Sequence, residues 1–199
     1  MDIEFTLINQ STVADVDVVI FQKNMDLSYW EMPIAWKVIR NVKPGAGHLF
    51  RFPTENEIAV EDVGGKLSEL QSCAPGQLWY IMNDADGGAE LRLQGKASVS
   101  WREITVLNML SFGFMNVKLF KDKKLLAAKC NVPPKQKAMF EFRPVLRIAV
   151  ARGVAEGRSF GSDADLSAGT EISLAGVTKA DIILTGNGAP FKFTLRRTA

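Results

Sequence analysis

Two stretches of this 199-residue chain repeat each other, and this internal repeat constrains the fold more than any other feature. Residues 41–60 align without a gap with residues 131–150 at an offset of 90, and eight of the twenty pairs are identical. Unrelated segments of average composition would share roughly one or two. A repeat of this kind predicts two similar structural units. The identical pairs are Asn41/Asn131, Val42/Val132, Pro44/Pro134, Phe50/Phe140, Phe52/Phe142, Ile58/Ile148, Ala59/Ala149 and Val60/Val150.

The similarity continues on both sides of this block. Residues 4–21 resemble residues 103–120 at an offset of 99, and residues 89–95 resemble residues 180–186 at an offset of 91. The alternative is that strands of any origin resemble each other. We interpret the ordered succession of three blocks as a tandem duplication. The identical pairs of the first flanking block are Glu4/Glu103, Thr6/Thr105, Asn9/Asn108, Val18/Val117 and Phe21/Phe120.

Apolar and polar residues alternate along most of both halves, which is the pattern of half-buried β-strands. Turn residues such as Pro44-Gly45 and Asp86-Gly87-Gly88 separate the alternating segments. Only residues 62–72 show a helical spacing of apolar residues, which predicts one short helix. The expected strands are 3–7, 16–20, 34–40, 48–52, 57–61, 77–82, 89–94, 103–108, 114–120, 124–130, 137–142, 145–151, 170–175, 180–185 and 190–197.

About seven short strands in about 99 residues is typical of an immunoglobulin-like or related β-sandwich. We therefore predict an all-β protein with two tandem, homologous β-sandwich lobes of immunoglobulin-like size, residues 1–98 and residues 99–199. Only residues 96–100 lie between them, with no Pro- or Ser-rich linker. The lobes are expected to pack closely, as a pseudo-twofold pair or as one continuous sandwich.

The net charge of +2 conceals two halves of opposite charge. Residues 1–98 hold 8 Lys and Arg against 14 Asp and Glu, a net charge of −6, and residues 99–199 hold the remaining 16 against 8, a net charge of +8. An acidic lobe and a basic lobe favour oriented association, either within one chain or between chains. A nucleic-acid partner is not expected, because the lysines of residues 121–137 have no interleaved aromatic residues for base stacking.

The sequence offers few residues for catalysis or metal binding, with one histidine and two cysteines. Gly157–Gly161 matches the Gly-x-Ser-x-Gly motif, but that motif needs a strand-to-helix turn and a histidine later in the chain, and the only histidine is His48. Asp84–Gly87 and Asp163–Asp165 lack the further carboxylates of a calcium loop. We predict a chain that is not an enzyme, with no cofactor and no metal.

A difference in length between the repeats points to a candidate binding loop. The first half carries nine more residues than the second between the aligned blocks, around Asn24–Pro33. Tyr29, Trp30 and Met32 in this segment are the candidate ligand-binding residues, because exposed aromatic loops often form contact surfaces. The alternative is that the segment covers an open sheet edge or the seam between the lobes.

The chain shows no sign of a membrane span or a signal peptide. No apolar run approaches the roughly 18–20 residues of a transmembrane helix, and the first residues contain no basic segment followed by an apolar one. We expect a cytoplasmic protein, which leaves non-classical export open. In that compartment Cys73 and Cys130 are expected to be free thiols, although the sequence is also compatible with one bridge.

Three segments together resemble a family of uncharacterised microbial all-β proteins of about 200 residues: Ile20–Asn24, Ala35–Ile39 and Glu171–Leu174. The resemblance implies an all-β fold and no particular activity or site. From the residues we predict a non-enzymatic binding or recognition module, with a lectin-like module as one form and a protein or a carbohydrate as the partner. The alternative is a structural protein that self-assembles through its acidic and basic lobes.

Overall fold

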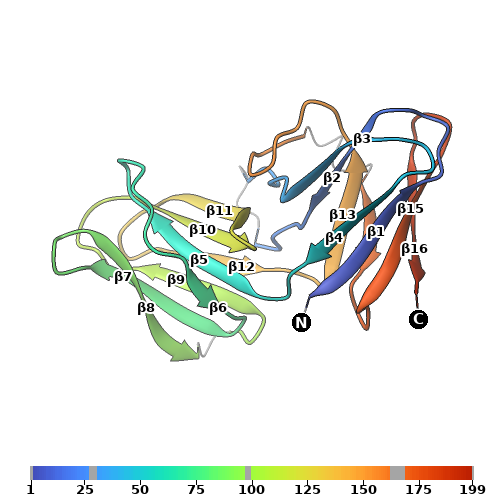
Figure 1. Ribbon diagram of the computed structural model, residues 1–199. Helices are drawn as coiled ribbons and strands as arrows, with labels where there is room; N and C mark the ends of the chain where they lie inside the picture. The colour runs from blue at the N-terminus through green and yellow to red at the C-terminus, as the bar shows by residue number, and fades with distance from the viewer. Residues whose placement is uncertain (1, 27–30, 97–99, 162–168, 199) are drawn as a thin grey trace. The chain divides into compact units, whose positions relative to one another are not determined.

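The computed structural model describes residues 2–26, 31–96, 100–161 and 169–198 (Figure 1). All regular secondary structure in these residues is β-strand, which confirms the predicted all-β class. The strands form four sheets of four strands each, and the chain divides into two compact units with two sheets in each. No helix among the described residues is long and apolar enough to span a membrane.

Unit 1 is assembled from three separate parts of the chain, Met1–Lys23, Met32–Thr54 and Pro144–Ala199. Its sheets have the strand orders β16-β15-β1-β4 and β14-β13-β2-β3. β1 lies antiparallel to β4 and parallel to β15. The strands are β1 (Ile3–Asn9), β2 (Val16–Phe21), β3 (Lys37–Val42), β4 (Gly47–Phe52), β13 (Val145–Val150), β14 (Thr170–Ser173), β15 (Lys179–Thr185) and β16 (Lys192–Arg197).

Unit 2 consists of Asn24–Glu31 and Glu55–Arg143. Its sheets have the strand orders β12-β9-β7-β8 and β11-β10-β5-β6, and β9 lies antiparallel to β12 and parallel to β7. The strands are β5 (Asn56–Glu61), β6 (Gln71–Cys73), β7 (Gln77–Asn83), β8 (Ala89–Lys96), β9 (Glu103–Asn108), β10 (Met115–Lys121), β11 (Lys124–Val132) and β12 (Lys137–Glu141).

The two units do not coincide with the two halves of the sequence. Strands β1–β4 share sheets with β13–β16, and strands β5–β8 share sheets with β9–β12. The expected lobes 1–98 and 99–199 are therefore wrong as structural units, because each half of the chain supplies four strands to each unit. Alternation and turn residues identify strands locally, whereas the choice of pairing partner depends on contacts distant in sequence.

The two units nevertheless have the same strand order. Each sheet of unit 1 becomes a sheet of unit 2 when every strand is replaced by the strand eight places away in the order of the sixteen strands that the described residues form. β1 then corresponds to β9, β4 to β12 and β15 to β7. The correspondence includes the parallel pair, which is β1 with β15 in unit 1 and β9 with β7 in unit 2.

This correspondence corrects one block of the sequence alignment. Residues 89–95 lie on β8, an edge strand, whereas residues 180–185 lie on β15, which is flanked on both sides. The strand of unit 2 in the position of β15 is β7. The similarity at an offset of 91 therefore matches two strands in different positions, because any two amphipathic strands share alternating apolar residues.

Most expected strands are present with shifts of up to about three residues, but the helix expected over 62–72 is wrong. Residues 62–70 form a loop instead, and β6 follows directly. The carboxylate of Asp62 accepts hydrogen bonds from the backbone N–H groups of Gly64 and Lys66, both at 2.9 Å. These bonds stabilise a tight turn, which glycine favours over a helix.

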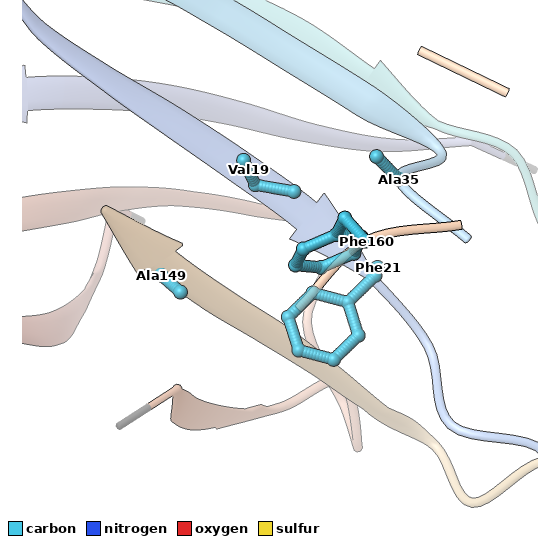
Figure 2. Close-up of a cluster of buried hydrophobic side chains, with 5 residues drawn as sticks. All are labelled: Val19, Phe21, Ala35, Ala149 and Phe160. Carbon is cyan, nitrogen blue, oxygen red and sulfur yellow. The ribbon is translucent and has the colours of Figure 1, made fainter. Parts of the chain in front are cut away.

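The core of unit 1 includes a cluster of side chains from distant parts of the chain (Figure 2). Phe160 packs edge-to-face against Phe21 of β2, with ring centroids 5.0 Å apart. Phe160 belongs to the Gly-x-Ser-x-Gly segment, which therefore contributes an apolar side chain to the core. The other members of the cluster are Val19, Ala35 and Ala149.

The repeated phenylalanines lie on corresponding strands, β4 and β12. Phe50 pairs with Phe5 of β1, and Phe140 pairs with Ile104 of β9 in the same register. Phe50, Phe52 and Phe140 are buried, as the alternation predicts, and Phe142 is half-buried just beyond the end of β12.

Candidate functional site

The segment predicted to bind ligand, Asn24–Pro33, is described at both ends only. Tyr29 and Trp30 lie outside the described residues. Met32 is exposed, and so is Met25 near the other end of the segment. The described part of the predicted site, Met32, is therefore at the surface.

The described ends of this segment are held on unit 2 by buried polar side chains. Asn24 bonds to β12, where its Nδ2 donates to Met139 O at 3.1 Å and its Oδ1 accepts from Glu141 N at 2.9 Å. Lys129 on β11 donates to Asp26 Oδ2 at 3.1 Å and to Glu31 Oε1 at 2.8 Å, and its side chain is 8% exposed. β11 and β12 are edge strands of the two sheets. The described ends of the segment thus contact strands at open sheet edges, the location that the sequence analysis gives as the alternative.

Sequence reasoning missed a second loop with exposed apolar residues. Met109, Phe112 and Phe114 lie between β9 and β10, and Phe112 and Phe114 are 81% and 53% exposed. The signal was available, because the residues between the strands expected over 103–108 and 114–120 include Met109, Leu110 and Phe112, whereas a turn is normally polar. The difference in length between the two repeats points to Asn24–Pro33 instead.

The base of this loop is fixed by a buried side chain. Asn108 is fully buried, its Nδ2 donates to Val132 O at 3.0 Å and Gly113 O at 3.3 Å, and its Oδ1 accepts from Leu110 N at 3.1 Å. Gly113 has φ +92°, a conformation that favours glycine. The two phenylalanines therefore flank a fixed reversal of the chain instead of folding into the core.

Further loops reach the same end of unit 2 (Figure 1). β5 ends at Glu61, which pairs with Asn116 at the start of β10, and β11 ends at Val132, which pairs with Met115. The loop after β5 therefore adds exposed apolar residues to those of the loop after β9. We call this set the apolar loop end; its residues are Val63, Leu67, Met109, Phe112 and Phe114.

The loops at this end carry a small excess of negative charge. The loops 62–70, 84–88, 109–114 and 133–136 contain four acidic residues and two basic residues, Lys66 and Lys135. Two of the acids have local roles: Asp62 forms the turn described above, and Asp84 Oδ1 accepts hydrogen bonds from Asp86 N at 2.9 Å and Gly88 N at 2.6 Å. The surroundings of the apolar residues are therefore polar and weakly acidic.

Two groups with catalytic potential, Ser159 and His48, belong to unit 1. Ser159 is exposed and bridges to Ile34 in unit 1, and His48 is half-buried on the face of β4 that also carries Phe50 and Phe52. Both cysteines are unpaired, and burial raises the pKa of the Cys73 thiol to about 12. A thiol with this pKa is a poor nucleophile at neutral pH. Among the described residues, no group of three or more His, Cys, Asp or Glu is placed to hold a metal ion.

The charge contrast between the sequence halves does not carry over to the compact units. Unit 1 holds 12 Lys and Arg against 9 Asp and Glu, a net charge of +3, and unit 2 holds 12 against 13, a net charge of −1. The acidic and basic lobes expected from the sequence are corrected accordingly, because each unit mixes strands of both halves.

No protein-family model matches the chain, and neither the curated proteins nor the solved structures searched contain a match.

Proposed function

We propose that this chain is a non-enzymatic binding module that captures a protein partner through the apolar loop end of unit 2. The observation that carries the proposal is the exposure of Phe112 and Phe114 on a loop whose base is fixed by the buried Asn108. Phenylalanine side chains held at the surface by a fixed loop lose little conformational entropy on binding. They also remove a large apolar area from water when a partner covers them.

The chemistry of this end favours a protein over a carbohydrate or a membrane. The loop Met109–Phe114 offers Ser111 as its only hydroxyl side chain, whereas a sugar needs several hydrogen-bonding groups. The acidic excess of the surrounding loops opposes binding to an anionic lipid surface. It suits a partner with an apolar pocket and a basic rim.

The test is site-specific photo-crosslinking in the native host. A photoreactive phenylalanine analogue at position 112 should give a discrete protein adduct, and Phe114→Ser should reduce its yield at least fivefold. The matched control is the same analogue at Val13, which occupies the corresponding place between β1 and β2 of unit 1. No adduct at position 112, or the same adducts at both positions, would contradict the proposal.

Vesicles test the membrane alternative separately. The purified protein should not sediment with phosphatidylcholine vesicles that contain phosphatidylglycerol. Sedimentation that Phe112→Ser abolishes would overturn a protein partner in favour of a lipid surface.

A second candidate function rests on the segment Asn24–Pro33. Exposure of Met25 and Met32 at its described ends supports Tyr29, Trp30 and Met32 as ligand-binding residues, here for a carbohydrate that stacks on aromatic rings. A glycan array probed with the native chain and with Trp30→Ala tests this function. Binding should disappear in the variant while the melting temperature stays within about 2 °C.

We also propose that both units derive from one duplicated sequence whose repeats exchange their second halves. The registers support this idea, since Val18 pairs with Val150 in unit 1 and Val117 pairs with Val60 in unit 2. Val117 follows Val18 by 99 residues, and Val150 follows Val60 by 90 residues, which are the two offsets that relate the repeats in sequence. Asn41 and Asn131 also share a positive φ, 53° and 56°.

A further inference from the structure

The outer face of the sheet β12-β9-β7-β8 in unit 2 is unusually apolar. Alternation along β9 directs Ile104 and Val106 into the core and Glu103, Thr105 and Leu107 to the opposite face. Thr105 lies beside Met139 on one side and Leu78 on the other, and it is only 5% exposed although it faces outward. The half-buried apolar residues of this face are Leu78, Tyr80, Met82, Leu107 and Met139, and we call them the apolar sheet face.

The corresponding face of unit 1 is charged. There Glu4 pairs with Arg51 at 3.4 Å, and Asp181 pairs with Arg196 at 2.6 Å. Asp181 occupies the position that Leu78 holds in unit 2, because it registers with Thr6 as Leu78 registers with Thr105. Ion pairs of this kind keep a sheet face in water. On the corresponding face of unit 2 the ion pair between Glu90 and Arg92, at 2.5 Å, lies on the edge strand β8, beside Met82 and Tyr80, and the described residues of the central strands β7 and β9 form none.

One edge of the apolar sheet face carries two acidic residues where unit 1 has an ion pair. Glu103 registers directly opposite Glu141, in the place of Glu4 opposite Arg51. Like charges directly opposite each other on neighbouring strands are unfavourable. Moreover, Glu103 Oε2 is a buried atom with no hydrogen-bond partner within the described part of the chain. The two carboxylates give this edge of the apolar sheet face a local negative charge.

We propose that the apolar sheet face binds the same face of a second copy of this chain, in a symmetric dimer. Lys137 is exposed and lies two residues before Met139 on β12, and Glu141 lies two residues after it. A twofold axis in the interface, perpendicular to the strands and passing at Met139, places Lys137 of each copy opposite Glu141 of the other. The face is thus self-complementary in charge around an apolar centre.

This dimer is independent of the proposed protein partner, since it uses a sheet face and not the loops. The first test is sedimentation of the full chain between low and high micromolar concentration. The native chain should form a dimer, and Met139→Glu should shift its dissociation constant upward by at least tenfold. The matched control is Leu49→Glu, which places the same charge on the corresponding strand of unit 1 and should leave the dimer unchanged.

Charge reversal provides the decisive test. Lys137→Glu and Glu141→Lys should each weaken the dimer, because each puts like charges opposite each other across the axis. An equimolar mixture of the two variants should associate again, since both contacts between the unlike chains are then Glu opposite Lys. The mixture also separates a lost contact from a failure to fold, because misfolded chains would not restore a dimer.

A native chain that stays monomeric at several hundred micromolar would overturn the proposal. A dimer that tolerates Met139→Glu and both charge reversals would overturn it as well, by placing the interface elsewhere. The crosslinking at position 112 is unaffected by either outcome, so the two proposals fail separately.

Discussion

Unit 1 and unit 2 agree closely in their interiors and differ on their surfaces. Asn9 and Asn108 show the agreement: both are fully buried at the end of corresponding strands. Asn9 donates to Val42 O at 2.8 Å and accepts from Ser11 N at 2.8 Å. Asn108 donates to Val132 O at 3.0 Å and accepts from Leu110 N at 3.1 Å. One side chain therefore fixes the same loop base in both units.

The loops that these asparagines support are unlike each other. In unit 1 the loop 10–15 has no aromatic residue and Ser11 is buried, whereas in unit 2 Phe112 and Phe114 are exposed at the corresponding end. The outer sheet faces differ in the same sense, because the central strands β1 and β15 of unit 1 form ion pairs, whereas the central strands β7 and β9 of unit 2 carry mostly apolar side chains. Unit 2 therefore carries both candidate interaction surfaces, the apolar loop end and the apolar sheet face, whereas the interior that the two units share determines the fold.

The largest expected effect concerns the boundaries of the units. Residues 55–143 contain all eight strands of unit 2, whereas residues 99–199 contain β9–β16, half of each unit. We expect the fragment 55–143 to fold alone, with dispersed amide resonances and cooperative urea unfolding. The fragment 99–199 should be less ordered, because its native sheet partners are missing. The opposite result, a folded 99–199 and an unfolded 55–143, would restore the boundary suggested by the sequence.

Sequence patterns predicted most strands of this fold because they are local features. The alternation of apolar and polar residues predicts β9 with the bounds that the structure shows, residues 103–108. The assignment of strand groups to compact units is the part that the sequence predicted wrongly, since β1–β4 could share sheets with β5–β8 or with β13–β16 on equal grounds. Nothing in the alternation of one strand specifies which of two similar partners it takes. Contacts between residues more than a hundred positions apart decide it, as Phe21 and Phe160 illustrate.

Replacement of the buried asparagines tests the agreement between the interiors. Asn9→Ala and Asn108→Ala should each lower the free energy of unfolding by about 2–4 kcal/mol, because each leaves buried backbone groups without partners. Urea denaturation of both variants measures the loss. The control is Asn83→Ala, an exposed asparagine at the end of β7, which should change stability by less than about 0.5 kcal/mol. A large loss in one variant and none in the other would show that the two loop bases are not equivalent.

Lys129 allows a smaller test of a difference between the units. It occupies the position that buried Ile39 holds on β3 of unit 1, at the offset of 90. Lys129→Ile should change global stability by only about 1 kcal/mol, because an apolar residue replaces a partly buried ion pair. The substitution should nevertheless remove the ion pairs of Asp26 and Glu31. The backbone amide of Met25, which donates to Glu141 O at 2.8 Å, should then exchange its hydrogen with solvent at least tenfold faster. Lys66→Ala is the control, and equal exchange in both variants would mean that Lys129 does not hold the segment.

The candidate site could be predicted only in part, for a related reason. A longer loop is visible in sequence, and Asn24–Pro33 was found by its length. Whether an apolar loop residue faces water or core is not visible, because Phe112 and Phe160 both lie between strands and only Phe160 is buried. In three dimensions the buried side chain of Asn108 fixes the base of the loop that carries Phe112. The sequence shows that Asn108 repeats Asn9, but the hydrogen bonds of its side chain are visible only in the structure.

The smallest expected effect is a pH dependence that belongs to unit 2 alone. Glu61 accepts hydrogen bonds from Lys118 and from Asn116, and these bonds, with the lysine first, hold the pKa of its carboxyl below the usual 4.5. At the same positions unit 1 has Val19 and Ala151 in place of Lys118 and Glu61. Because the pKa is lowered by folding, the pair stabilises unit 2 above about pH 4.5 and the stabilisation is lost as the pH falls through the lowered value.

Glu61→Gln should therefore lower the free energy of unfolding by at most about 1 kcal/mol at pH 7 and by less at pH 3. Urea denaturation of both chains at the two pH values measures the difference, which should shrink as the pH decreases. Glu69→Gln, an exposed glutamate on the following loop, is the control and should show no such trend. An equal loss at both pH values would mean that Glu61 acts through packing and not through its charge, and the contrast with unit 1 at this position would then be one of shape alone.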